Sequence, residues 1–74
     1  YGTVKIIEGE LKNKDIILIE DVITTGNSIL ETINSLNKLE YNVKYVISIF
    51  KRKKFNYNIF KKLNIKYFYL TKNN

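Results

Sequence analysis

The sequence predicts an α/β fold in which a parallel sheet lies between layers of helices. An apolar run without alternation, residues 16–19, is typical of a strand covered on both faces, as in a three-layer parallel arrangement. The run is followed by a segment of helical periodicity and then by a second strand-like segment. This succession implies a right-handed parallel crossover. With 74 residues, the chain forms at most one small domain.

The first part of the chain is predicted to contain two strands separated by a turn. Residues 4–7 form a short apolar run, and residues 11–15 are polar and typical of a turn. The central strand at 16–19 then ends in two acids, Glu20 and Asp21. Ligands of parallel sheets bind beyond the carboxyl ends of the strands, so we expect the two acids at a ligand site.

A helix is predicted from Ser28, because apolar residues recur from there at helical spacing. Glu31 stands three residues after Ser28, which is the spacing of a capping box. Asn42 is the expected stop, since asparagine is the residue after glycine that most readily adopts a left-handed conformation. One face of this helix holds Ile29, Ile33, Leu36 and Glu40, with Leu30 and Leu39 beside it.

The second half of the chain repeats the pattern. Residues 43–50 are rich in β-branched and aromatic side chains and predict a strand. A basic run follows at 51–54, and residues 65–70 are expected to form the last strand, with a frayed tail at 71–74. Helical spacing between these strands is found at Phe55, Ile59, Phe60 and Leu63. We interpret the later aromatic residues as core and not as a platform for stacking bases: Tyr57, Phe60, Tyr67, Phe68 and Tyr69.

The segment after the central strand has the composition of an anion-binding loop. Gly26 allows a tight turn and a close approach to a ligand, and Thr24, Thr25 and Ser28 supply hydroxyl groups. Free N–H groups and the dipole at the start of the next helix favour a phosphate. The two preceding acids suit the vicinal hydroxyls of a sugar, or positive charge that develops on it. The implied ligand is a ribose 5-phosphate; the alternative, a helix cap without a ligand, needs neither three hydroxyls nor a glycine.

The string LIEDVITTGNS, residues 18–28, resembles the phosphoribosyl pyrophosphate motif of type I phosphoribosyltransferases, and its ITTG core resembles the orotate phosphoribosyltransferases. The opening YGT and the IIEG of residues 6–9 resemble the same branch, and the likeness extends to about Leu70. It implies a partial domain of the type I phosphoribosyltransferase (Rossmann-like) fold. Residues 1–74 would be the C-terminal part of a single domain whose N-terminal part is absent, which agrees with the lack of methionine.

The resemblance also implies a reaction, in which the phosphoribosyl group of phosphoribosyl pyrophosphate is transferred to orotate in UMP biosynthesis. Glu20 and Asp21 would be the catalytic residues and would hold the ribose hydroxyls, while Mg²⁺ binds mainly through the substrate and not directly to the protein. Thr24 and Arg52 would contact orotate. The residues implied to bind phosphoribosyl pyrophosphate are Glu20, Asp21, Val22, Ile23, Thr24, Thr25, Gly26, Asn27 and Ser28.

Arg52 is the only arginine of the chain, and it follows the predicted second strand. A planar guanidinium is suited to pairing with a carboxylate such as that of orotate. The surroundings depart from the family pattern, in which an acid precedes this arginine and Gln or Glu with glycines follow it. Here the neighbours are Lys51, Lys53, Lys54 and Phe55. A different purine or pyrimidine phosphoribosyltransferase, or a non-catalytic regulator that senses phosphoribosyl pyrophosphate, is therefore kept as an alternative.

Composition restricts the remaining classes. The net charge is +6, but all except one of the 13 basic residues are lysine, and we interpret this as compositional drift and not as a nucleic-acid interface. The absence of cysteine and histidine excludes a disulfide, a thiolate site and a histidine-based zinc site in this segment. No apolar run approaches the roughly 20 residues of a membrane span. We expect a cytoplasmic, homodimeric parent enzyme with phosphoribosyl pyrophosphate and orotate as partners, and no turnover from this segment alone.

Overall fold

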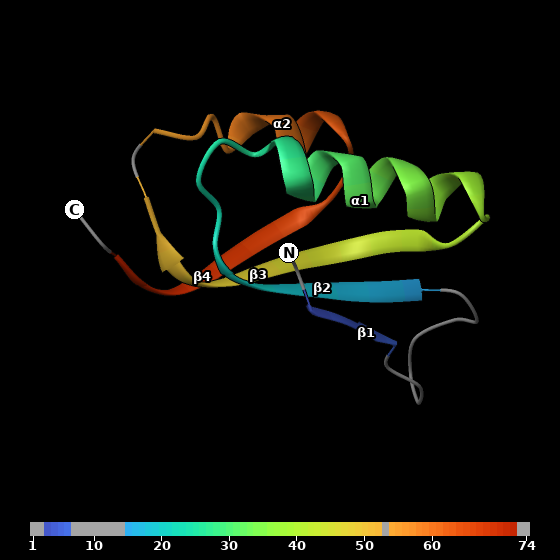
Figure 1. Cartoon of the computed structure of the whole chain (residues 1–74), viewed down its shortest axis with the longest axis horizontal. Coiled ribbons are helices and arrows are strands. Elements are labelled where there is room, and N and C mark those ends of the chain that lie inside the picture. Colours follow the sequence, from blue (N-terminus) through green and yellow to red (C-terminus); the bar gives the residue numbers. More distant parts are fainter. Residues whose placement is uncertain (1–2, 7–14, 53, 73–74) are drawn as a thin grey trace.

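The computed structural model describes residues 3–6, 15–52 and 54–72. Its four described strands form one sheet in the order β1-β2-β3-β4 (Figure 1). Among the described residues, no helix is long and apolar enough to cross a membrane. Along the chain the elements are β1 (Thr3–Ile6), β2 (Asp15–Val22), α1 (Asn27–Lys38), β3 (Asn42–Lys51), α2 (Asn58–Lys62) and β4 (Lys66–Lys72).

The predicted parallel α/β architecture is confirmed. Strand β2 pairs in parallel with β3, and β3 pairs in parallel with β4. Helix α1 connects the first two of these strands and α2 connects the second two. In the register of the sheet Glu20 lies opposite Ser48, and Val22 lies opposite Phe50, so the carboxyl ends of β2 and β3 reach the same edge.

Strand β1 differs from the others because it pairs antiparallel to β2, with Thr3 opposite Ile19. The connection to β2 explains this direction, since residues 7–14 are fewer than the dozen or so that a parallel crossover requires. Residue 7 of the predicted first strand and residues 11–14 of the predicted turn lie outside the described residues. Asp15, which was assigned to that turn, belongs to β2.

Both helices cover the same face of the sheet (Figure 1). The described residues therefore form two of the three predicted layers. The opposite face carries Phe68 and Leu70, which are 51% and 73% exposed. The prediction that Phe68 is a core residue is thus wrong for the described chain, as it is for Tyr69 at 39% exposure. The core between sheet and helices consists of Ile16, Leu18, Ile23, Ile29, Ile33, Val43, Val46, Phe55, Phe60 and Ile65.

The start of α1 differs from the predicted capping box. The helix begins at Asn27, and Gly26 precedes it as the N-cap in a left-handed conformation with φ of 87°. The hydroxyl of Thr25, and not that of Ser28, accepts a hydrogen bond from the Asn27 N–H at 3.3 Å. Ser28 already lies inside the helix, where its carbonyl accepts a hydrogen bond from the Thr32 hydroxyl.

The end of α1 was also misplaced by the sequence prediction. The left-handed residue is Glu40, with φ of 68°, and not Asn42, which opens β3. The N–H of Glu40 donates to the carbonyl of Asn37, and the N–H of Tyr41 donates to that of Leu36. These two bonds form a Schellman motif. The turn places Leu39 in solvent, 64% exposed, instead of beside the apolar face of the helix.

Helix α2 is shorter than the spacing of apolar residues predicted. Phe55 precedes it in a loop but still packs into the core, whereas Leu63 follows it and is 43% exposed. The helix ends in a second Schellman motif, with left-handed Asn64 and a hydrogen bond of 2.8 Å from the Ile65 N–H to the Phe60 carbonyl. The connection from α2 to β4 is therefore a tight turn, and it places Tyr67 beneath the helices.

Candidate functional site

A small pocket lies where β2 passes into α1. We call residues 23–26, which connect these elements, the β2–α1 loop. The pocket holds about 70 Å³ and is partly open, so it is large enough for a small polar group. Its lining consists of Glu20, Val22, Ile23, Thr24, Thr25, Gly26, Ser28 and Ile29.

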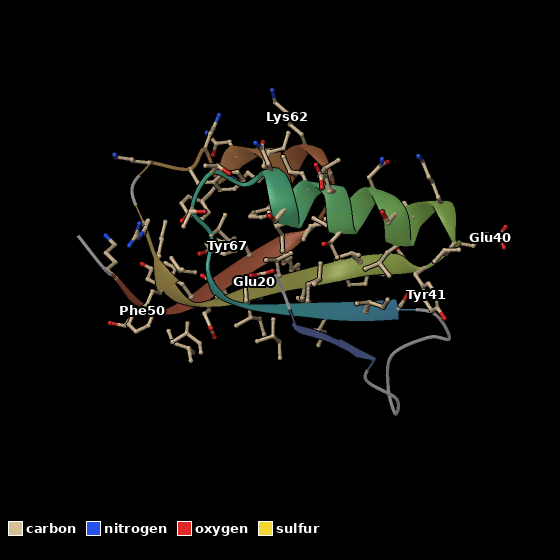
Figure 2. All side chains as sticks on the ribbon, in the orientation of Figure 1. Glu20, Glu40, Tyr41, Phe50, Lys62 and Tyr67 are labelled. Atoms are coloured by element: carbon tan, nitrogen blue, oxygen red, sulfur yellow. The ribbon has the colours of Figure 1, made fainter. Side chains whose placement is uncertain are left out.

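Glu20 is the charged side chain of this pocket. It lies on the helix-covered side of the sheet and is only 8% exposed (Figure 2). Its Oε1 atom is buried and has no hydrogen-bond partner within the part of the chain that the structure describes. Burial, and further the neighbouring Asp21 carboxylate, raise the pKa of Glu20 above its ordinary value. An unpaired buried acceptor costs about 1–3 kcal/mol, and a hydroxyl group or a cation supplied by a ligand would satisfy it.

Asp21 is not brought into the pocket with Glu20. Strand β2 extends to Val22, so side chains still alternate between the faces of the sheet at the two acids. Glu20 therefore faces the helices, whereas Asp21 is exposed and does not line the pocket. The strand continues one residue beyond the two acids that were predicted to end it, and the main chain of Glu20 and Val22 pairs with β3.

The β2–α1 loop presents hydroxyl groups and main-chain N–H groups at the pocket. The side chains of Thr24, Thr25 and Ser28 are exposed at its rim, whereas Ile23 is buried in the core. The first hydrogen bond back into α1 runs from the Leu30 N–H to the Gly26 carbonyl at 3.0 Å. The Asn27 N–H donates to the Thr25 hydroxyl, whereas the N–H groups of Ser28 and Ile29 have no acceptor inside the helix and are suited to an anion.

Arg52 lies at the same edge of the sheet, at the start of the β3–α2 loop, which comprises residues 52–57 with residue 53 outside the described chain. Its side chain is exposed. Phe55 of this loop reaches across to the β2–α1 loop. A Cβ atom added to Gly26 would lie 1.9 Å from the Cε1 atom of Phe55, so the ring occupies the space that any other side chain would need. The two loops are therefore in direct contact.

Sequence reasoning missed a pair of hydroxyl groups next to Glu20. Ser48 lies opposite Glu20 in the sheet, is fully buried, and its Oγ lies 2.5 Å from the hydroxyl oxygen of Tyr67. Burial raises the pKa of Tyr67 to about 12, so this hydroxyl stays protonated at neutral pH. Figure 2 shows Glu20 and Tyr67 on the same side of the sheet. The available signal was a serine inside a run of apolar residues, with Val46 and Ile47 before it and Ile49 and Phe50 after it.

The acidic side chains of the described residues do not gather into a metal centre. Among the described residues, no group of three or more Asp, Glu, His or Cys side chains could hold a metal ion. Mg²⁺ is commonly bound by one or two carboxylates together with substrate phosphates. The unpaired oxygen of Glu20 fits this arrangement, whereas Asp21 faces the other side of the strand.

Comparison with known proteins finds similarity to phosphoribosyltransferases. No family model and no solved structure matches the chain. It is 34% identical over 50 residues to a hypoxanthine/guanine phosphoribosyltransferase of Methanothermus fervidus, which covers 66% of this chain and 26% of that protein. It is 55% identical over 38 residues to uridine 5'-monophosphate synthase of Caenorhabditis elegans, covering 50% of this chain and 8% of the synthase. The chain is thus similar to phosphoribosyltransferases over part of their length.

An orotate phosphoribosyltransferase is similar to most of the chain. The chain is 41% identical over 68 residues to the orotate phosphoribosyltransferase of Methanosphaera stadtmanae, which covers 90% of this chain. The chain spans only 38% of the length of that relative. The predicted resemblance to the orotate branch is thereby confirmed, whereas the roles of the individual site residues stay predictions.

Proposed function

We propose that the chain is the C-terminal part of an orotate phosphoribosyltransferase domain. The parent enzyme would transfer the phosphoribosyl group from phosphoribosyl pyrophosphate to orotate, giving orotidine 5'-phosphate and pyrophosphate. The observation that carries the proposal is the unpaired buried oxygen of Glu20 at a pocket whose other wall is the hydroxyl-rich β2–α1 loop. A ribose phosphate supplies a hydroxyl group that can donate to the Glu20 oxygen and a phosphate anion that can bind at the β2–α1 loop.

The 5-phosphate would bind at the β2–α1 loop. Thr24, Thr25 and Ser28 offer hydroxyl groups there, and the start of α1 offers main-chain N–H groups. Each contact at a helix terminus contributes about 0.3–1 kcal/mol, so several together can anchor a phosphate. This binding energy is remote from the reacting bond, and it can be used to orient the anomeric carbon for attack by the base.

The acids would act on the ribose. Glu20 accepts a hydrogen bond from a ribose hydroxyl, and its carboxylate stabilises the positive charge that develops on the ring as the pyrophosphate leaves. Asp21 would contribute from the exposed side of the strand end, a role supported by resemblance alone. Mg²⁺, bound mainly through the substrate, would neutralise charge on the pyrophosphate. No nucleophilic side chain is required for such a reaction.

The base would be recognised by Thr24 and Arg52. Thr24 lies at the pocket rim, and the guanidinium of Arg52 would pair with the carboxylate of orotate. Support comes from the shared edge of the sheet, where the strands that precede both residues end. We further propose a cytoplasmic, homodimeric parent enzyme and no turnover from residues 1–74 alone, for which likeness to the orotate enzymes is the support.

The test is calorimetric titration of the full-length gene product, first with phosphoribosyl pyrophosphate and Mg²⁺ and then with orotate. We expect Glu20→Gln and Asp21→Asn each to weaken the first ligand by about tenfold or more, the equivalent of about 1.4 kcal/mol. Arg52→Ala should lower the affinity for orotate and leave the affinity for phosphoribosyl pyrophosphate unchanged. Lys54→Ala, an exposed position in the same loop, is the matched control and should leave both affinities within about twofold. If the wild-type protein binds neither ligand, the proposal is wrong.

A purine phosphoribosyltransferase is the second candidate function. It is favoured by the similarity to the Methanothermus hypoxanthine/guanine enzyme and by the lysines around Arg52, which depart from the orotate pattern. The same titration separates the two candidates when hypoxanthine and guanine are added in place of orotate. Binding of a purine without binding of orotate would retain the ribose-phosphate site and reassign the base.

A further inference from the structure

The main chain of Arg52 is held by a single side chain, that of Tyr57. The Arg52 N–H donates a hydrogen bond to the Tyr57 hydroxyl oxygen at 3.1 Å, and the same hydroxyl donates to the Arg52 carbonyl at 2.7 Å. One phenolic group thus satisfies both polar main-chain groups of the residue. Arg52 is the first residue after β3, so the sheet fixes its main chain on one side only.

The ring of Tyr57 is itself fixed by packing. It stacks on the ring of Tyr67 at a centroid distance of 4.7 Å and meets the ring of Phe55 edge to face at 4.9 Å. The ammonium group of Lys51 lies 4.8 Å from its centroid. Aromatic pairs of this kind contribute about 0.5–1.5 kcal/mol each beyond the burial of their area. The hydroxyl of Tyr57 is therefore held at a defined position relative to the core.

The aromatic residues that pack around Tyr57 also contact the β2–α1 loop. Phe55, the edge-to-face partner of Tyr57, fills the space beside Gly26 in the β2–α1 loop. The path from Arg52 through Tyr57 and Phe55 to Gly26 consists of direct contacts throughout. The start of the β3–α2 loop is thus set relative to the pocket by side chains that do not line the pocket themselves.

We propose that Tyr57 is a positioning residue, whose hydroxyl fixes the main chain of Arg52 so that the guanidinium is presented to the carboxylate of the acceptor base. This inference rests on the proposed function, because it takes Arg52 as the group that binds the base. Tyr57 contacts no substrate in this arrangement; it acts through Arg52. Without its hydroxyl the base site loses its preformed geometry, while the ribose-phosphate site is unaffected.

The experiment compares Tyr57→Phe with Tyr45→Phe in the full-length gene product. Both substitutions remove one hydroxyl and keep the ring, and both residues are half-buried, but Tyr45 packs against Phe68 on the opposite face of the sheet. Three quantities are measured: the hydrogen-exchange rate of the Arg52 amide by NMR, and the two affinities, for orotate and for phosphoribosyl pyrophosphate with Mg²⁺, by calorimetry.

We expect Tyr57→Phe to raise the exchange rate of the Arg52 amide and to weaken the binding of orotate by about tenfold. The affinity for phosphoribosyl pyrophosphate should stay within about twofold of wild type. Tyr45→Phe should leave all three quantities unchanged. Equal losses for both ligands, or an unchanged Arg52 amide, would overturn the inference. If the wild-type protein binds no orotate, the proposed function has failed, and the amide exchange then decides alone whether Tyr57 holds Arg52.

Discussion

The β2–α1 loop and the β3–α2 loop meet at one edge of the sheet, but different kinds of interaction hold them. The first is shaped by its main chain: Gly26 is left-handed, and its carbonyl accepts the first hydrogen bond of α1. The second is shaped by side chains, because Tyr57 holds Arg52 and Phe55 packs into the core. A loop shaped by its main-chain conformation requires particular residue types, and these can be recognised in the sequence. A loop held by aromatic packing uses residues that cannot be told from ordinary core residues in the sequence.

The contact between the loops is the most sensitive point of this comparison. In Gly26→Ala the new Cβ would lie 1.9 Å from the Phe55 ring, at a φ of 87° that side chains rarely adopt. We expect the free energy of unfolding, measured by urea denaturation of the full-length protein, to fall by about 2 kcal/mol or more.

The double variant Gly26→Ala with Phe55→Leu separates the two causes of this loss. If the clash with the ring dominates, a double-mutant cycle will show a coupling of about 1 kcal/mol or more between the two positions. If the strain of the left-handed conformation dominates, the two losses will add. A loss below about 0.5 kcal/mol in Gly26→Ala alone would show that the loops are not packed as described.

The pH dependence of stability sharpens the description of the pocket. Because burial raises the pKa of Glu20 in the folded state, the folded protein binds this proton more tightly than the unfolded protein does. The stabilisation is fully present below the unfolded pKa and is lost as the pH rises through the folded pKa. In Glu20→Gln this loss is absent.

The variant Glu20→Gln should therefore unfold at a higher temperature than wild type at pH 7, by the equivalent of roughly 1 kcal/mol, and the difference should shrink toward pH 4. Thermal unfolding at several pH values measures it. Glu31→Gln on the exposed side of α1 is the control and should follow the wild-type profile. A destabilised Glu20→Gln variant at pH 7 would mean that the carboxylate has a partner in the folded protein.

The smallest expected effect concerns Ser28. Its hydroxyl does not cap α1, so Ser28→Ala should change the free energy of unfolding by less than about 0.5 kcal/mol, while weakening phosphoribosyl pyrophosphate a few-fold through one lost phosphate contact. Thr25→Ala removes the hydroxyl that accepts from the Asn27 N–H, and it should cost about 1 kcal/mol of stability. The reverse order of the two losses would restore Ser28 as the cap.

The sequence predicted the order of the elements and the pocket loop because both depend on local residue types. Asn42 illustrates where such signals fail. Asn64 does end α2 in the left-handed conformation, but α1 ends with Glu40 in that conformation and leaves Asn42 to open β3 and bond to Asp15. At the end of α1, the position of the left-handed residue follows from the two Schellman hydrogen bonds and not from the preference of asparagine for this conformation. The prediction from composition also did not reveal that Glu20 and Asp21 face opposite sides of the sheet, because this depends on β2 continuing through both residues.

The parts of the site that were missed depend on contacts between distant segments. Ser48 lies next to Glu20 because of the parallel register of β2 and β3, and this register cannot be read from the sequence. Tyr57 was interpreted as core, and its ring is indeed part of the aromatic cluster, but its hydroxyl has a second role that appears only when Arg52 is placed beside it. Burial of an aromatic ring and use of its hydroxyl are independent properties.

Strand β4 is the outermost strand of the described sheet, and its position has a consequence for encounters between copies of the chain. An unpaired strand edge is a template onto which another strand can add. The residues between Lys66 and Lys72 are uncharged and mostly aromatic or apolar, a composition that favours such addition. The two lysines at its ends repel an identical strand and act as gatekeepers against aggregation. The excess of lysine, which gives no information about partners, thus helps to keep copies of this segment apart.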